Sequence, residues 1–213
     1  MVFHAHCWWH LNMREKRQDA VEEQIYRQEL SQLIRSTPWL MSILETVRKC
    51  NPPDWLVGAG VMRNLVWDHL HQYQTPTPLA DIDVIFFDPQ DIRPERDRMV
   101  QQQLARRLPH VAWEATNQAA VHLWYEEVFG FSVPALHSSE EAVGTWPETA
   151  TSVAVRLLAT DEIYIVAPCG LSDLFNMVLR RNPCRVTREQ FVQRLHSKQI
   201  LRKWPRVQVI YDE

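Results

Sequence analysis

The stretch that decides the fold is LVGAGVMRN, residues 56–64, which is followed by DIDVIFF, residues 81–87. The first segment predicts a strand, a glycine turn and a helix, and the second is the strongest strand pattern in the chain. Five glycines occur in 213 residues, and two of them, Gly58 and Gly60, lie in this one turn. Average usage would give about fifteen glycines. The turn is therefore a place where the backbone bends tightly or approaches a ligand closely.

The turn at Gly58 and Gly60 stands directly before a predicted helix, so the free amides of that helix point into the gap. Amides at a helix N-terminus form a natural phosphate site. Glycines that merely relieve helix–strand packing are the alternative explanation. The segment differs from a Walker loop because no Gly-Lys-Ser/Thr follows, and Arg63 occupies the last place of a GxGxxG pattern. From the first helical turn, the Arg63 guanidinium either reaches a triphosphate or pairs with a nearby acid.

Asp81 and Asp83 stand two residues apart on the predicted strand, so their carboxylates project to one side with Cα atoms roughly 6–7 Å apart. Ile82 and Val84 face the opposite way, into apolar packing. Two like charges on one side of an apolar strand repel each other and resist desolvation. A bound cation removes both penalties, and an oxygen-only pair with open positions suits Mg²⁺ or Mn²⁺. Taken alone, the motif also fits a solvated strand start with two surface acids.

The remaining periodicity predicts helices and strands in an order typical of an α/β domain with a mixed sheet. The expected organisation is a single domain over residues 19–213, preceded by a flexible extension of residues 1–18. Residues 121–145 are ambiguous and contain helical pieces. We expect helices at 19–35, 38–49, 61–72, 94–108, 171–179 and 187–203, strands at 55–57, 81–87 and 111–115, and a hairpin of residues 152–158 and 163–166.

The composition is that of an ordinary globular protein, with 46% hydrophobic and 23% charged residues and a net charge of −3. No apolar run approaches the ~18 residues that a membrane span needs. The four cysteines show no CxxC spacing and no secretory signal is evident, so we expect reduced thiols and a cytoplasmic location. His4, His6, Cys7 and His10 are expected to belong to the flexible extension and to hold no metal.

Nine cationic side chains face a single acid, Glu189, between Arg180 and Arg206. Such a segment favours binding to an RNA backbone or to the phosphates of a polyanionic acceptor. A solvated helix surface, balanced by acids elsewhere in the chain, is the alternative.

Together, the glycine turn and the DxD strand resemble the nucleotidyltransferase fold shared by DNA polymerase β and the CCA-adding enzymes. CCA-type enzymes carry a Gly-Gly-x-x-Arg-Asp stretch followed by a DxD strand, and residues 59–64 followed by 81–83 look like a variant of that pattern. Ala59 stands in place of the first Gly and Asn64 in place of the Asp. The twenty residues between Gly60 and Asp81 also exceed the usual spacing. These departures put a tRNA substrate in doubt.

Over roughly residues 40 to 210, the chain is similar to a family of bacterial nucleotidyltransferase-like proteins that brings no settled substrate. The resemblance implies a nucleotidyltransferase-like mixed β-sheet flanked by helices, with an additional C-terminal hairpin and helices, and a transferase activity. The similar blocks are residues 54–60, Arg63-Asn64, residues 78–84, Asn117-Gln118 with His122, residues 146–151 and residues 167–171.

The superfamily normally has a third carboxylate on the strand after DxD, and Glu114 occupies that place here, unless it is simply a solvent-facing residue. Asp88 is a weaker candidate because it follows the end of the strand. Asn117, Gln118 and His122 frame a base or acceptor pocket or, alternatively, make interior hydrogen bonds. The expected catalytic and metal-binding residues are Asp81, Asp83 and Glu114. The expected nucleotide-binding residues are Gly58, Ala59, Gly60, Arg63, Asn64, Asn117 and Gln118.

The resulting hypothesis is a metal-dependent transferase that moves an NMP group from an NTP to a hydroxyl acceptor and releases pyrophosphate. The acceptor class, whether small molecule, RNA or protein, stays open, and Mg²⁺ or Mn²⁺ is the expected cofactor. The alternative is a non-catalytic nucleotide- or RNA-binding module on the same fold. A DxD glycosyltransferase is disfavoured, because mostly two helices and one strand precede the motif instead of a complete nucleotide-binding βαβ region.

Overall fold

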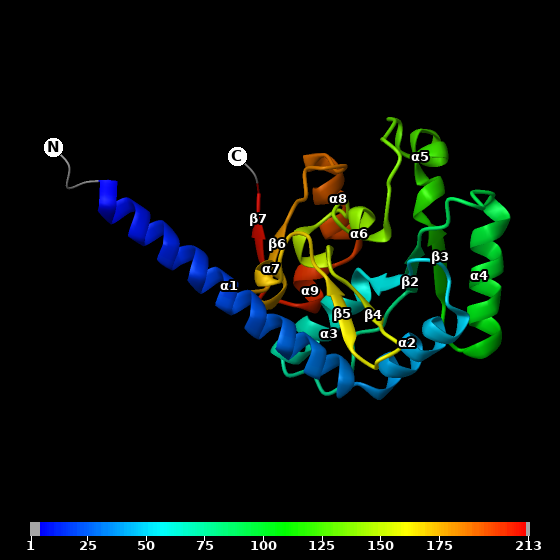
Figure 1. Ribbon diagram of the computed structural model, residues 1–213, viewed down its shortest axis with the longest axis horizontal. Coiled ribbons are helices and arrows are strands. Elements are labelled where there is room, and N and C mark those ends of the chain that lie inside the picture. Colours follow the sequence, from blue (N-terminus) through cyan, green and yellow to red (C-terminus); the bar gives the residue numbers. More distant parts are fainter. Residues whose placement is uncertain (1–4, 212–213) are drawn as a thin grey trace.

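The structure is a computed structural model that describes the backbone of residues 5–211 and the side chains of residues 18–211. A mixed sheet in the order β3-β2-β1-β4-β5 lies at its centre, with a smaller pair, β6 and β7, to one side and helices packed around both (Figure 1). The strands are β1 (Leu56–Gly58), β2 (Ile82–Phe86), β3 (Trp113–Asn117), β4 (Ala154–Leu157), β5 (Ile163–Val166), β6 (Val178–Arg180) and β7 (Gln208–Ile210). The helices are α1 (Ala5–Arg35), α2 (Pro38–Cys50), α3 (Gly60–Leu70), α4 (Pro94–Arg107), α5 (Val121–Phe129), α6 (Ser139–Val143), α7 (Ser172–Phe175), α8 (Arg188–Ser197) and α9 (Ile200–Lys203), with 3-10 turns at Gln118–Ala120 and Thr149–Thr151.

The predicted class, a mixed sheet flanked by helices, is confirmed. Strand β1 pairs antiparallel with β2 and β4, and β2 pairs parallel with β3 through the α4 crossover. The predicted hairpin is formed by β4 and β5, and the ambiguous residues 121–145 contain α5 and α6. The extension predicted for residues 1–18, with its His and Cys side chains, lies almost entirely outside the residues described with side chains and stays a prediction, as does the single domain over 19–213. Among the described residues, no helix combines the length and apolar character needed to cross a bilayer.

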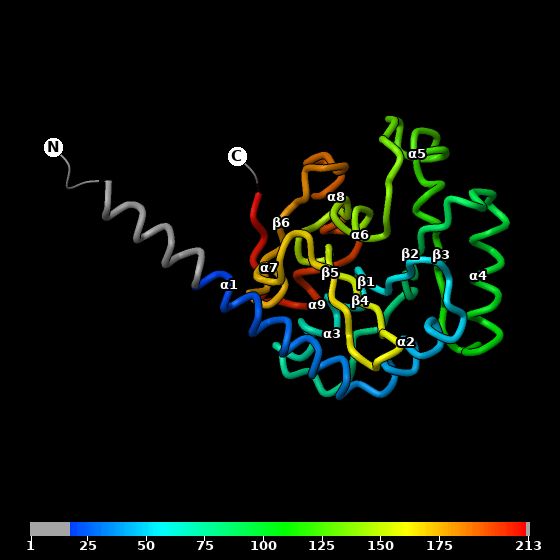
Figure 2. Tube along the Cα trace, in the orientation of Figure 1, coloured from blue at the N-terminus to red at the C-terminus, as the bar shows by residue number. Residues whose placement is uncertain are grey.

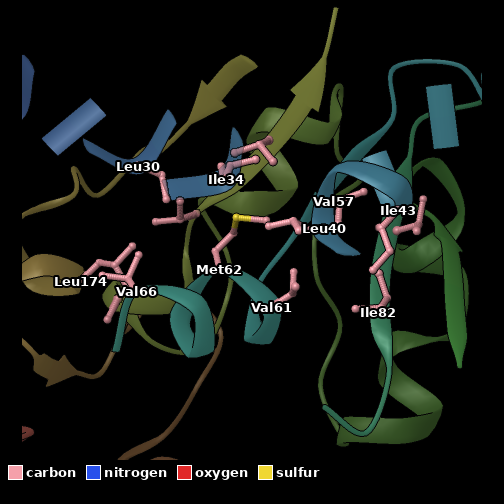
Figure 3. Packing of buried hydrophobic residues seen from close by; sticks show 14 of the residues in the cluster. Leu30, Ile34, Leu40, Ile43, Val57, Val61, Met62, Val66, Ile82 and Leu174 are labelled. Carbon is pink, nitrogen blue, oxygen red and sulfur yellow. The ribbon is translucent and has the colours of Figure 1, made fainter. Parts of the chain in front are cut away.

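One face of the sheet forms the large apolar core. On β2 the alternating residues Ile82, Val84 and Phe86 point into this core and are buried there, as the strand periodicity predicts. Helices α1, α2, α3 and α7 supply the other side of the packing. Figure 3 shows their contributions: Leu30, Ile34, Leu40, Ile43, Val61, Met62, Val66 and Leu174, packed near Val57 and Ile82.

The opposite face of the sheet carries a smaller apolar cluster. Leu56 of β1, Ile85 of β2 and Ala154 of β4 pack there against α6. Because successive residues of a strand alternate between faces, Asp83 lies on this second face next to Ile85. The functional groups of β2 therefore lie on the side of the sheet that the main core leaves free.

The C-terminal third differs from the two long helices predicted for residues 171–179 and 187–203. Helix α7 ends at Phe175, and the following β6 pairs parallel with β7. Strands of three residues carry no periodic signal of their own, and these two exist because each satisfies the backbone of the other. The second predicted helix divides into α8 and α9 at Gln199, whose φ of 53° places it in the left-handed region.

Candidate active site

Three carboxylates meet at one point of the sheet. Asp83 of β2 lies directly opposite Glu114 of β3 in the parallel register, and Asp81 stands one residue before β2. One carboxylate oxygen of each lies within 4.8 Å of the others. The alternative for Glu114, a solvent-facing side chain unrelated to the aspartates, is not what the structure shows: Glu114 is exposed, but it faces the aspartate pair.

The donor set of this trio fits a divalent cation. All the ligand atoms are carboxylate oxygens, the type that Mg²⁺ and Mn²⁺ prefer. Burial raises the pKa of Asp83 to about 6, with further contributions from the negative charges of Asp81 and Glu114, while Lys198 and Arg194 oppose the shift. A cation between the three groups would offset the repulsion that contributes to this shift of the Asp83 pKa.

The protonation of Asp83 predicts how stability without a bound cation depends on pH. The folded chain holds this proton up to about pH 6, whereas an ordinary aspartate releases it near 3.8. Stability contributed by the protonated form is therefore present below pH 3.8 and is lost as the pH rises through 6. We expect urea denaturation of the EDTA-treated protein to show about 2 kcal/mol less stability at pH 7 than at pH 4, relative to Asp83→Asn. Parallel pH profiles of the two proteins would contradict the assignment.

A cleft of about 440 Å³ opens over the trio. Its floor is formed by alternate residues of β2 and β3, with the charged pair Asp83 and Glu114 followed by the neutral pair Ile85 and Thr116. The N-terminus of α3 forms one wall, and residues of the C-terminal segment line the cleft as well. The cleft is thus acidic at the trio and neutral further along its floor.

The two glycines of the turn are required for different physical reasons. A Cβ on Gly58 would lie 2.6 Å from the Cβ of Ala154 and from the carbonyl oxygen of Val153, so this glycine permits β1 to pack against β4. A Cβ on Gly60 would meet one neighbouring atom, 3.9 Å away on Arg63. Gly60 lines the cleft and leaves the start of α3 open to a ligand. The packing explanation therefore holds for Gly58, and close ligand approach fits Gly60.

Ala59, between the two glycines, has φ 58° and ψ −120°. An L-residue is strained in this conformation, and its amide is already used because it donates to the carbonyl of Val153 at 3.0 Å. We expect Ala59→Gly to stabilise the protein by about 1 kcal/mol in urea denaturation, because glycine adopts this conformation without steric cost. Ala105→Gly, inside α4, is the matched control and should lose about 1 kcal/mol. Destabilisation by both substitutions would contradict the strain at Ala59.

Arg63 is the most enclosed cation of the cleft, with 9% of its surface exposed. Its guanidinium carbon lies 5.2 Å from the ring centroid of Trp204 and 5.8 Å from that of Trp67, and one nitrogen donates to the Asn64 side chain at 2.8 Å. Among the described residues Arg63 forms no salt bridge, and its buried Nε has no hydrogen-bond partner. Burial lowers the pKa of Arg63. This arginine has spare donors facing the cleft, as a phosphate-binding residue requires.

Three further cations, Arg194, Lys198 and Lys203, line the cleft from the C-terminal segment. Arg194 is held by a 2.8 Å ion pair between its Nε and Oε1 of the buried Glu148. The sequence prediction singled out the cationic segment as a whole and missed these individual residues. Other members of the segment have structural contacts instead, such as Arg185, which packs 5.3 Å from the Tyr125 ring centroid. The segment is therefore not uniformly a solvated surface, because part of it forms a wall of the cleft.

The polar residues predicted after β3 separate into two groups. Gln118 lines the cleft, whereas Asn117 does not. The buried Asn117 amide accepts from the backbone of Asp88 and Ala119 and donates to the carbonyls of Asp88 and Asp91, so it holds the loop after β2 and is committed to interior bonds. Asp88 is paired with Arg96 at 2.7 Å and lies outside the trio. His122 also lies outside the cleft lining.

Known proteins resemble this chain in sequence and in structure. A family model described as nucleotidyltransferase matches residues 45–209. A protein whose NMR structure is described as revealing a CCA-adding enzyme head domain is 28% identical, with a TM-score of 0.72 over 87% of this chain and 96% of that one. Complexes of CCA-adding enzyme with CTP and with ATP are 13% and 14% identical, with TM-scores of 0.52 and 0.50; each match covers 85% of this chain and 43% of the enzyme, so the chain spans less than half of their length. No curated protein matches the sequence.

Proposed function

Because the chain belongs to the nucleotidyltransferase family, we propose that it transfers an NMP group from an NTP to a hydroxyl acceptor and releases pyrophosphate. The single observation that carries this proposal is the convergence of Asp81, Asp83 and Glu114 within 4.8 Å in a cleft whose walls are cationic. Carboxylates alone would repel a triphosphate, and cations alone would not hold a metal. Their combination fits a nucleotide that arrives together with a divalent ion.

The proposed roles follow from the position of each group. Arg63, Arg194, Lys198 and Lys203 bind the triphosphate oxygens, and the open start of α3 at Gly60 lets the phosphates approach the helix amides. Gln118 and Asn64 border the nucleoside or acceptor. Arg63 and Arg194 are already held beside the cleft by Trp204 and Glu148.

Asp81, Asp83 and Glu114 would hold Mg²⁺ or Mn²⁺. When bound, such an ion neutralises charge on the phosphates and makes the acceptor hydroxyl more acidic. Glu114, the exposed member of the trio, receives the proton of the acceptor hydroxyl, whose oxygen attacks the α-phosphorus. The bond from that phosphorus to the bridging oxygen breaks, and pyrophosphate leaves along the cationic wall.

The test is a pyrophosphate-release assay with each of the four NTPs, Mg²⁺ or Mn²⁺, and separate acceptor pools of small polyols, RNA 3′ ends and unfolded polypeptide. CTP and ATP are the first nucleotides to examine, because CCA-adding enzyme has been solved with both. We expect metal-dependent release of pyrophosphate with at least one acceptor, together with a covalently labelled product when the α-phosphate is radioactive. Nucleotide binding that ignores metal and survives Asp81→Asn would favour the non-catalytic binding module.

A further inference from the structure

Asp68 of α3 is a buried carboxylate that the proposed chemistry does not use. It is 8% exposed and does not line the active-site cleft. Its oxygens accept three hydrogen bonds, from the backbone nitrogen of Thr77 at 2.6 Å, from the Thr77 hydroxyl at 2.6 Å and from Nε1 of Trp204 at 2.7 Å. Within residues 18–211 it forms no salt bridge. A buried carboxylate without hydrogen bonds is costly, so these three neutral donors, together with the nearby charge of Arg63, stabilise Asp68 in its buried position.

The partners of Asp68 belong to two segments that both reach the cleft. Thr77 precedes Asp81 by four residues, and Pro78, Leu79 and Ala80 between them line the cleft. Trp204 follows Lys203 and supplies the ring beneath the Arg63 guanidinium. Figure 2 shows the C-terminal chain returning to α3 at this point, where the Trp67 and Trp204 rings meet edge to face at 5.4 Å. The Asp68 carboxylate thus connects the segment that precedes Asp81 with the segment that carries the cationic wall.

The Thr77–Asp81 segment borders open space, although Leu79 packs against the main core and the N–H of Ile82, directly after the segment, donates to the carbonyl of Ala112 at 2.8 Å. Pro78 and Leu79 line the cleft on one side and a second cavity of about 430 Å³ on the other. Leu79, Ala80 and Asp81 also border a third cavity of about 200 Å³. Open space beside a segment leaves fewer close contacts to define its position. The sheet holds the end of this segment at Ile82, and the two bonds from Thr77 to Asp68 anchor its start.

We propose that Asp68 is a positioning residue that places Asp81 through Thr77 and places Arg63 and Lys203 through Trp204. The proposal rests on the proposed function, because it assigns the Thr77 branch of this network to metal binding and the Trp204 branch to nucleotide binding. Residues that hydrogen-bond to metal-binding side chains and orient them typically change metal affinity or activity by about 10- to 100-fold when they are substituted. Each branch should therefore be separable by a conservative substitution.

The test uses the full chain and four variants. Thr77→Val removes the hydroxyl bond of the Thr77 branch. Trp204→Phe removes the bond of the Trp204 branch and keeps a ring beside Arg63. Asp68→Asn disturbs both branches, because the NH₂ group of asparagine would face a hydrogen-bond donor where a carboxylate oxygen accepted a bond. Asp88→Asn is the matched control, since Asp88 is another buried carboxylate, bonded to Arg96, outside the cleft. Calorimetry measures the Kd of Mn²⁺ without nucleotide and the Kd of ATP in EDTA, and neither measurement requires turnover.

We expect Thr77→Val to weaken Mn²⁺ binding about tenfold and ATP binding by less than about twofold, and Trp204→Phe to do the reverse. Asp68→Asn should weaken both, and Asp88→Asn neither. Loss of thermal stability with unchanged dissociation constants, or equal effects of Asp88→Asn, would overturn the proposal. If the wild type binds neither probe, the proposed function fails first. Hydrogen exchange then decides separately whether Asp68→Asn accelerates exchange in both residues 74–81 and residues 199–205, and unchanged exchange would also overturn the proposal.

Discussion

Asp83→Asn is expected to reduce nucleotidyl transfer by about a thousandfold or more while it stabilises the protein without metal. Asp83 lies at the centre of the trio, with Asp81 on its own chain segment and Glu114 opposite it in the register of β2 and β3. An amide in its place keeps the shape but provides one neutral oxygen where a charged ligand stood. Activity and stability should therefore change in opposite directions, because the negative charge of Asp83 is needed for metal binding and destabilises the folded state without metal.

The measurement pairs initial rates of pyrophosphate release with urea denaturation in EDTA at pH 7. Asp88→Asn is the control, because it removes a buried carboxylate that is paired with Arg96, and it should lose stability and keep the rate. A double substitution, Asp81→Asn with Asp83→Asn, extends the test. Activity that survives in the double variant would end the proposed mechanism. Loss of stability in Asp83→Asn would contradict the burial and the repulsion that raise the pKa of this carboxyl.

Gly58→Ala is expected to destabilise the protein by about 3 kcal/mol or to prevent its folding. The added methyl group would lie 2.6 Å from the Val153 carbonyl oxygen and 2.8 Å from the Cα of Ala154. These are backbone atoms of β4 and of the residue before it, so the clash is relieved only by separating β1 from β4 in the middle of the sheet. No flexible side chain is available to absorb the change.

Gly60→Ala, two residues later, is the matched control for this effect. Its added methyl group meets one atom, at the far end of the Arg63 side chain, at an ordinary distance of 3.9 Å. We expect its urea midpoint to stay near that of the wild type and the KM for NTP to rise, because the methyl group enters the cleft. If the two substitutions destabilise equally, the division between a packing glycine and a ligand-facing glycine is wrong.

The contrast between predicted and missed residues follows from how local each signal is. Asp81 and Asp83 were predicted because strand alternation places residues two apart on one face. The three cleft cations of the C-terminal segment were not predicted individually, because nine positive residues look alike in the sequence. What separates Arg194 from Arg185 is its partner, a buried Glu148 in one case and the Tyr125 ring in the other.

Asn117 is a case in which local sequence left two roles open. It was predicted to bind nucleotide, yet its amide is occupied by four bonds to the loop after β2 and to the turn after β3. An asparagine next to a site has the same chemistry whether it faces a ligand or the backbone. Which of the two it faces depends on the loop that folds against it. The residues around Asn117 do not predict the path of residues 88–91.

The sequence by itself determined the strand–turn–helix unit around Gly58, the DxD strand and the face of β2 that carries the carboxylates. These features depend on neighbours within a few residues, where backbone geometry and alternation leave little choice. Tertiary structure alone decided that Glu114 stands opposite Asp83, that β6 and β7 pair, and that Trp204 returns to Asp68 beside the cationic wall. Those contacts join residues from about 30 to more than 130 positions apart, and their free energy comes from burial and hydrogen bonds that exist once the whole chain has packed.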